Sequence, residues 1–184
     1  MKPMSQMKIR KLILIAVVVI SAATCQLTAH AKAMSDEGDV RATVQRVFDQ
    51  LKSGQYGVLY DALPSTSRSR ISREGFVSGL QRTRDVYQLQ RIDIGAVRVS
   101  GNLAVVDTTM YAHVFKPLDA DGKLIVQQYL IREDGSWRVA TGDNATVNRF
   151  LKANPAFARK FPIKRPRAAI NQNGKWVDIP LGRR

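Results

Sequence analysis

The stretch YQLQRIDIGAVRVSGNLAVVDTTMYAHVF, residues 87–115, alternates apolar and polar side chains on both sides of a Ser-Gly-Asn break. Alternation with a period of two is typical of β-strands, and a short glycine-containing break between two such runs indicates a hairpin. The stretch therefore predicts two long antiparallel strands joined by a tight turn at residues 100–102.

Two more strand-like runs follow this hairpin, KLIVQQYLIR at 123–132 and WRVATG at 137–142, and each comes after a turn rich in Asp and Gly. Strands joined by short turns pair in sequence order, as in a meander. We therefore expect a four-stranded antiparallel sheet.

The residues before the hairpin have helical spacing instead. Apolar side chains recur from Val40 to Leu51 at intervals of three and four, with Asp39 as the expected N-cap and Gly54 as the stop. A short helix is expected in QYGVLYDAL at 55–63, and another opens at Ser72. Helices followed by one antiparallel sheet define the α+β class, with the N-terminal helices packed on one face of a curved four-stranded sheet.

The chain after Gly142 is less regular and forms a basic C-terminal extension. TVNRFLKANP predicts one or two helical turns that end before Pro155. AAINQNGKWVDI holds an Asn-Gly turn between short apolar runs, which predicts a small hairpin with Trp176 packed against the body. The expected organisation is a leader at 1–33, an α+β domain at 34–148 and the extension at 149–184.

The N-terminus has the pattern of a secretory signal peptide. A basic head precedes LILIAVVVISAATC, an apolar run shorter than the roughly 18 to 20 residues that span a bilayer. Small residues at Ala29, Ala31 and Ala33 fit a cleavage site near Ala31 or Ala33. The chain is therefore expected to be exported, periplasmic or extracellular, with lipidation at Cys25 or retention as an uncleaved anchor as alternatives.

Cleavage there limits the chemistry of the mature chain. Cys25 is the one cysteine of the sequence, and of its two histidines only His113 follows the cleavage site. A disulfide, a thiolate nucleophile and a multi-histidine zinc site are then excluded. DADG at 119–122 begins like a calcium loop but has Leu130 where glutamate is required, so no metal and no cofactor are expected.

The formal charge of +14 is unevenly distributed along the chain. Residues 33–148 hold 14 basic and 14 acidic side chains, whereas residues 149–184 hold 10 basic side chains and Asp178. A nucleic-acid-binding domain would carry its basic face on the folded body, so no nucleic-acid partner is expected. The extension is instead expected to bind an anionic partner in the cell envelope through Arg159, Lys160, Lys164, Arg165 and Arg167.

Three segments together resemble the nuclear-transport-factor-two-like superfamily of cone-shaped α+β domains. They are VQRVFDQLKSGQYGVLYDALP at 44–64, REGFVSGLQ at 73–81 and YLIREDGSWRVATG at 129–142, and the likeness covers about residues 36–142. The resemblance implies a conical pocket between a helical layer and a bent sheet. Some members use this pocket for catalysis, and many use the domain to bind, dimerise or scaffold.

The second hairpin strand carries the candidate catalytic residues. Asp107, Tyr111 and His113 share one face of this strand with Val105 and Thr109. If that face lines the cone, Asp107 or His113 would be a general base and Tyr111 an oxyanion donor, as in isomerase-like members. The alternative is an outer or dimer-forming face, which antiparallel sheets commonly leave polar.

A small-molecule site is the other candidate. The resemblance places Tyr56, Tyr60 and Asp61 near the cone mouth, with Thr109 and Tyr129 as further candidates, although helix aromatics are also common in cores. The sequence thus predicts an exported, non-catalytic binding domain whose ligand is a protein or a small molecule. An isomerase or hydro-lyase, or an envelope assembly component forming a homodimer through its sheet, are the alternatives.

Overall fold

The computed structural model describes residues 36–117, 119–140 and 144–181. The expected leader lies outside these residues, and residues 37–184 form one compact unit that includes the C-terminal extension. Within the described ranges, no helix is long and apolar enough to cross a bilayer.

The unit begins with helices. They are a helix over residues 36–53, α2 (Tyr56–Asp61), α3 (Ser65–Arg68) and α4 (Arg73–Gln81). Gly54 ends the first helix with a φ of 76°, a left-handed conformation that glycine adopts without strain. The Ser72 hydroxyl accepts from the Gly75 N–H at 3.1 Å, which confirms Ser72 as an N-cap. Asp39 lies inside the first helix, so its expected capping role is wrong.

One antiparallel sheet follows, formed by β1 (Tyr87–Ser100), β2 (Leu103–Val114), β3 (Ala120–Glu133), β4 (Ser136–Val139), β5 (Arg167–Gln172) and β6 (Lys175–Ile179). The strand order is β1-β2-β3-β5-β6, and β4 also pairs with β3. β4 occupies the Leu130–Glu133 part of β3, and β5 pairs with Gly122–Ile125 along the same strand. The α+β class is therefore confirmed, but the sheet has six strands because the extension adds two.

The sheet is bent by irregular pairing in β1. The register shifts between Leu89 and Arg91 and again between Ile94 and Val97. Bulges of this kind increase twist and curve a sheet. Gly95 lies in the second shift, where a Cβ would stand 3.1 Å from the Asp107 carbonyl oxygen, so the close approach of the two strands favours glycine.

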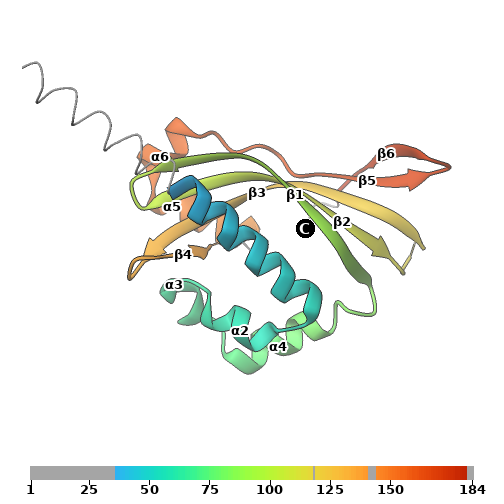
Figure 1. The fold of residues 1–184 in the computed structure, drawn as a ribbon, viewed down its shortest axis with the longest axis horizontal. Coiled ribbons are helices and arrows are strands. Elements are labelled where there is room, and N and C mark those ends of the chain that lie inside the picture. Colours follow the sequence, from blue (N-terminus) through green and yellow to red (C-terminus); the bar gives the residue numbers. More distant parts are fainter. Residues whose placement is uncertain (1–35, 118, 141–143, 182–184) are drawn as a thin grey trace, which may run out of the picture. The chain divides into compact units, whose positions relative to one another are not determined.

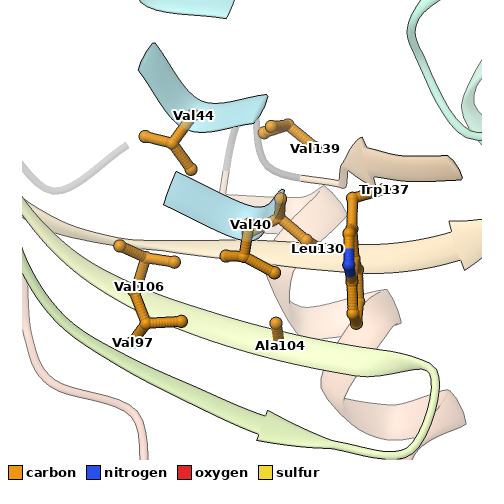
Figure 2. Close-up of a cluster of buried hydrophobic side chains, with 8 residues drawn as sticks. All are labelled: Val40, Val44, Val97, Ala104, Val106, Leu130, Trp137 and Val139. Atoms are coloured by element: carbon orange, nitrogen blue, oxygen red, sulfur yellow. The ribbon is translucent and has the colours of Figure 1, made fainter. Parts of the chain in front are cut away.

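The bend gives the sheet an inner face, which the helix over residues 36–53 covers (Figure 1). Val40 and Val44 of this helix pack against Val97, Val106 and strand residues beside them (Figure 2). The full set of buried residues in this inner core is Val40, Val44, Val97, Ala104, Val106, Leu130, Trp137 and Val139.

The C-terminal extension covers part of the opposite, outer face. α5 (Asn144–Ala153) leads into the extension and α6 (Pro155–Lys160) follows, and the Phe157 ring packs on Val105 and Tyr129 of the outer face. Phe150 and Phe161 complete this outer core, with ring centroids 5.9 and 5.0 Å from that of Phe157. The extension therefore folds back onto the domain.

The expected hairpin near the C-terminus is confirmed as β5–β6. Asn173 and Gly174 connect the two strands with φ angles of 52° and 82°. Positive φ at both central residues is the turn that matches the twist of paired strands. The ring centroid of Trp176 lies 6.0 Å from that of Tyr111, in an edge-on arrangement. Two fifths of the Trp176 surface stays exposed.

A candidate apolar binding cavity

A cavity of about 660 Å³ lies between the helices and the inner face of the sheet. The long helix and α4 contribute Val47, Phe48, Leu51, Phe76 and Leu80, and the central strands contribute Met110, Ala112, Val114, Leu124 and Val126. This volume is in the range of small-molecule sites in proteins. The cavity adjoins the inner core, since Val44 and Val139 belong to that core and also line the cavity.

The cavity wall is almost entirely apolar. Among the described residues that line it there is no Asp, Glu, His, Cys, Ser or Thr, and the polar side chains are Tyr87, Lys123 and Gln128. The Lys123 ammonium lies 4.5 Å from the centre of the Trp176 ring, on the side of β3 that Lys123 shares with its pairing partner Tyr111. The wall therefore suits a hydrocarbon-like ligand and offers little for acid–base chemistry.

The C-terminal extension completes this wall. Ala168 and Ile170 of β5 and Ile179 of β6 line the cavity. Ala168 pairs with Leu124 on one side and with Ile179 on the other, so the apolar inner face continues without a break into the added hairpin. Removing the extension would take away a side of the cavity.

The candidate catalytic residues lie on the other face of β2. Met110, Ala112 and Val114 point to the cavity, so Asp107, Tyr111 and His113 point to the outer face. The structure brings none of these three side chains to the cavity wall.

Asp107 is held in a polar cluster on that outer face. Both of its carboxylate oxygens accept from the Arg98 guanidinium, at 2.8 and 3.1 Å, and Lys164 Nζ donates at 2.8 Å. Gln127 Nε2 donates to it at 3.2 Å. These bonds, led by the one from Arg98, lower the pKa of Asp107 to about 2, so the carboxylate stays ionised.

His113 and Tyr111 are also bound to neighbours on the outer face. The two ring nitrogens of His113 lie 3.0 Å from Asp121 and 3.1 Å from Asp119, and these hydrogen bonds raise the pKa of the imidazole. The Arg91 guanidinium lies 3.5 Å from the centre of the Tyr111 ring. No cluster of three or more His, Cys, Asp or Glu able to hold a metal occurs among the described residues.

The five candidate ligand-binding residues are spread over different environments. Tyr129 is buried in the outer core, where burial raises the pKa of its hydroxyl, and Thr109 shares the outer face. Tyr60 donates to the Ile71 carbonyl at 3.0 Å, and Asp61 pairs with Arg73. Tyr56 alone of the five lines a hollow, a smaller one of about 280 Å³ beside the cavity.

Two of the five candidate anion-binding cations form ion pairs within the chain, and the Lys160 ammonium lies 5.3 Å from the centre of the Phe161 ring. Lys164 pairs with Asp107, and Arg167 pairs with Asp178 at 2.7 Å. Within the described part of the chain, Arg159, Lys160 and Arg165 are exposed and have no carboxylate at ion-pair distance. These three cations are therefore available to a partner.

Sequence reasoning missed the residues of the cavity wall, because they come from helices and strands far apart in the chain. Ala112 and Gly122 pair across β2 and β3, and Ala168 pairs with Leu124 two positions further along β3, so small residues lie close together on the cavity side, but the sequence does not show this register.

No protein-family model and no curated protein matches the chain. Among solved structures, the chain is similar to an LEH-like epoxide hydrolase from M. tuberculosis, with a TM-score of 0.40 and 14% identity, covering 69% of this chain and 98% of that one. Fold and cavity together define an α+β domain with an apolar cavity.

Proposed function

We propose that this chain is an exported, non-catalytic binding protein that holds an apolar small molecule in its cavity. The observation that supports this proposal is the composition of the cavity wall, in which nearly all side chains from the helices and the strands are apolar. Burial of apolar surface contributes about 25 cal/mol per Å², so such a wall favours a hydrocarbon-like ligand over water.

The absence of carboxylate and imidazole side chains from the described wall argues for binding without catalysis. A general base must reach the proton that it removes, and Asp107 and His113 are on the far side of the sheet. Their partners also favour a structural role, because Arg98 and Lys164 hold the Asp107 carboxylate ionised in a fixed position.

Filling the cavity should abolish ligand uptake. Ala112 lines the cavity, and Ala112→Trp adds an indole ring to the space that the ligand would occupy. The neutral dye N-phenyl-1-naphthylamine, whose fluorescence rises in apolar surroundings, should bind the purified chain saturably and bind A112W at least about tenfold more weakly.

Thr109→Trp is the matched control, because it adds the same ring to the outer face of the same strand. T109W should bind the dye within about twofold of the unchanged chain. Circular dichroism of both variants confirms that the sheet is intact. Saturable binding that A112W retains in full would show that the dye lies elsewhere and would overturn the proposal.

The second part of the proposal concerns the extension, which we infer binds an anionic surface of the cell envelope. Arg159, Lys160 and Arg165 are exposed near Ile163, whose surface is half exposed. Cations beside an exposed apolar side chain suit a lipid surface with anionic headgroups, where each cation contributes about 1 kcal/mol.

Sedimentation with vesicles tests this surface. The variant R159Q/K160Q/R165Q should bind vesicles containing phosphatidylglycerol at least about tenfold more weakly than the unchanged chain. R70Q/R82Q/K116Q, which removes three exposed cations from other parts of the domain, should bind nearly as well. Equal binding by the two variants, or binding that persists on purely zwitterionic vesicles and at high salt, would contradict the role of the extension.

A further inference from the structure

The smaller hollow differs in character from the cavity beside it. It has a volume of about 280 Å³ and is bordered by polar and aromatic side chains: Lys52, Tyr56, Thr83, Arg84, Gln88 and Phe115. Four residues line both spaces, namely Leu51, Leu80, Tyr87 and Leu89. An apolar space and a polar space are therefore direct neighbours that share a wall.

The charge of the hollow is positive. Lys52 and Arg84 line it, and no acidic residue is among the described residues that do so. Lys52 Nζ donates one hydrogen bond, to the Gln90 carbonyl at 2.7 Å, and an ammonium has two further N–H groups. Arg84 has no carboxylate within ion-pair distance in the described part of the chain. Both cations thus retain donors for an anion.

A structural role explains part of this arrangement. The Arg84 guanidinium lies within 3.6–3.8 Å of the position that a Cβ on Gly54 would take, at the C-terminal end of the first helix. Cations are favourable there because carbonyl groups are unpaired at a helix C-terminus. That contact positions the guanidinium over the hollow, but it does not require the apolar cavity to open beside it.

We propose that this hollow holds the anionic headgroup, a carboxylate or a phosphate, of an amphiphile whose hydrocarbon chain occupies the cavity. The inference rests on the proposed function, since the cavity must take the chain. Arginine binds carboxylate and phosphate oxygens through paired N–H groups, and such charge-assisted hydrogen bonds are stronger than neutral ones. The shared residues, Tyr87 among them, mark where the headgroup would meet the chain.

Competition against the neutral dye separates the headgroup from the chain. Dodecanoate, dodecyl phosphate and dodecanol have hydrocarbon chains of equal length and differ in the headgroup. We expect the two anions to displace the dye from the purified chain at least about fivefold better than dodecanol. The better of the two anions identifies the headgroup as carboxylate or phosphate.

Variants of the residues that line the hollow test whether they cause the preference for the anions. K52Q/R84Q should lose the preference for the anions while binding the dye and dodecanol unchanged, and R84K, which keeps the charge but not the paired N–H groups, should lose only part of it. Arg82→Gln is the matched control, because Arg82 is exposed on the same segment and does not line the hollow. Dodecanol competing as well as dodecanoate, or a preference that K52Q/R84Q retains, would overturn the headgroup site.

Direct calorimetry with dodecanoate distinguishes failure of this site from failure of the cavity. Absence of dye binding together with dodecanoate binding that K52Q/R84Q abolishes would refute the apolar cavity and support the anion site. Dye binding with no preference among the three amphiphiles would refute the anion site and support the cavity. Absence of both would refute both.

Discussion

Replacing Phe157 with alanine is expected to lower the free energy of unfolding by about 3 kcal/mol or more. The ring is 4% exposed and packs between the extension and the outer face of the sheet, against Val105, Tyr129, Phe150 and Phe161. Truncation removes the buried ring and leaves a cavity that its neighbours fill only in part. Urea unfolding followed by tryptophan fluorescence measures the loss.

Phe115→Ala provides the comparison for this measurement. Phe115 is an aromatic residue directly after β2 that is 41% exposed, so its truncation should cost less than about 1 kcal/mol. Similar, small losses in the two variants would show that the extension is an appendage on an independently stable domain. A loss confined to F157A shows that the extension is part of the folded core.

Replacing Asp107 with alanine should have the second largest effect, a loss of about 2 kcal/mol. The carboxylate accepts hydrogen bonds from Arg98, Gln127 and Lys164, and its side chain is 27% exposed. Its removal leaves the Arg98 guanidinium and the buried Gln127 amide without this partner. It also loosens residue 164, whose backbone N–H donates to Gln127 Oε1 at 2.7 Å.

Asp93→Ala is the control for this cluster. Asp93 is also an ion-paired aspartate on the sheet, but its side chain and that of its partner Arg91 are each more than half exposed. Surface pairs of this kind contribute little, so D93A should change stability by less than about 0.5 kcal/mol. Equal losses in D93A and D107A would mean that the Asp107 cluster is an ordinary surface pair.

The lowered pKa of Asp107 predicts how the stability of the fold depends on pH. The pKa of Asp107 falls from 3.8 to about 2 on folding, so the unfolded chain binds its proton more readily than the folded chain does. The resulting stabilisation, about 2 kcal/mol, is fully present above pH 4 and is lost as the pH falls toward 2. Chemical unfolding at pH 5 and at pH 2.5 should show a smaller decrease for D107A than for the unchanged chain.

The elements with local signals were predictable from the sequence. Alternation in residues 87–115 predicted β1 and β2, and the Ser72 cap and the Gly54 stop were recognisable because each depends on a few adjacent residues. The hairpin at Asn173 was predictable for the same reason, since an Asn-Gly pair adopts the required positive φ angles.

The partner of that hairpin was not predictable. β5 pairs with β3 across more than forty residues of chain, because β4 leaves the Gly122–Ile125 part of the β3 edge unpaired. Periodicity indicates that a strand forms, but it does not indicate which edge the strand will join. For this reason four strands were expected where the sheet has six.

Local sequence patterns have the same limit for the two faces of β2, of which one lines the cavity. The sequence by itself determined that Asp107, Tyr111 and His113 share one face and that Met110, Ala112 and Val114 share the other, since strand side chains alternate. The tertiary structure alone decided which face closes the cavity, because that depends on where the first helix packs and where α5 and α6 return. Side chains become buried by packing against distant segments of the chain, and a local sequence pattern does not indicate those contacts.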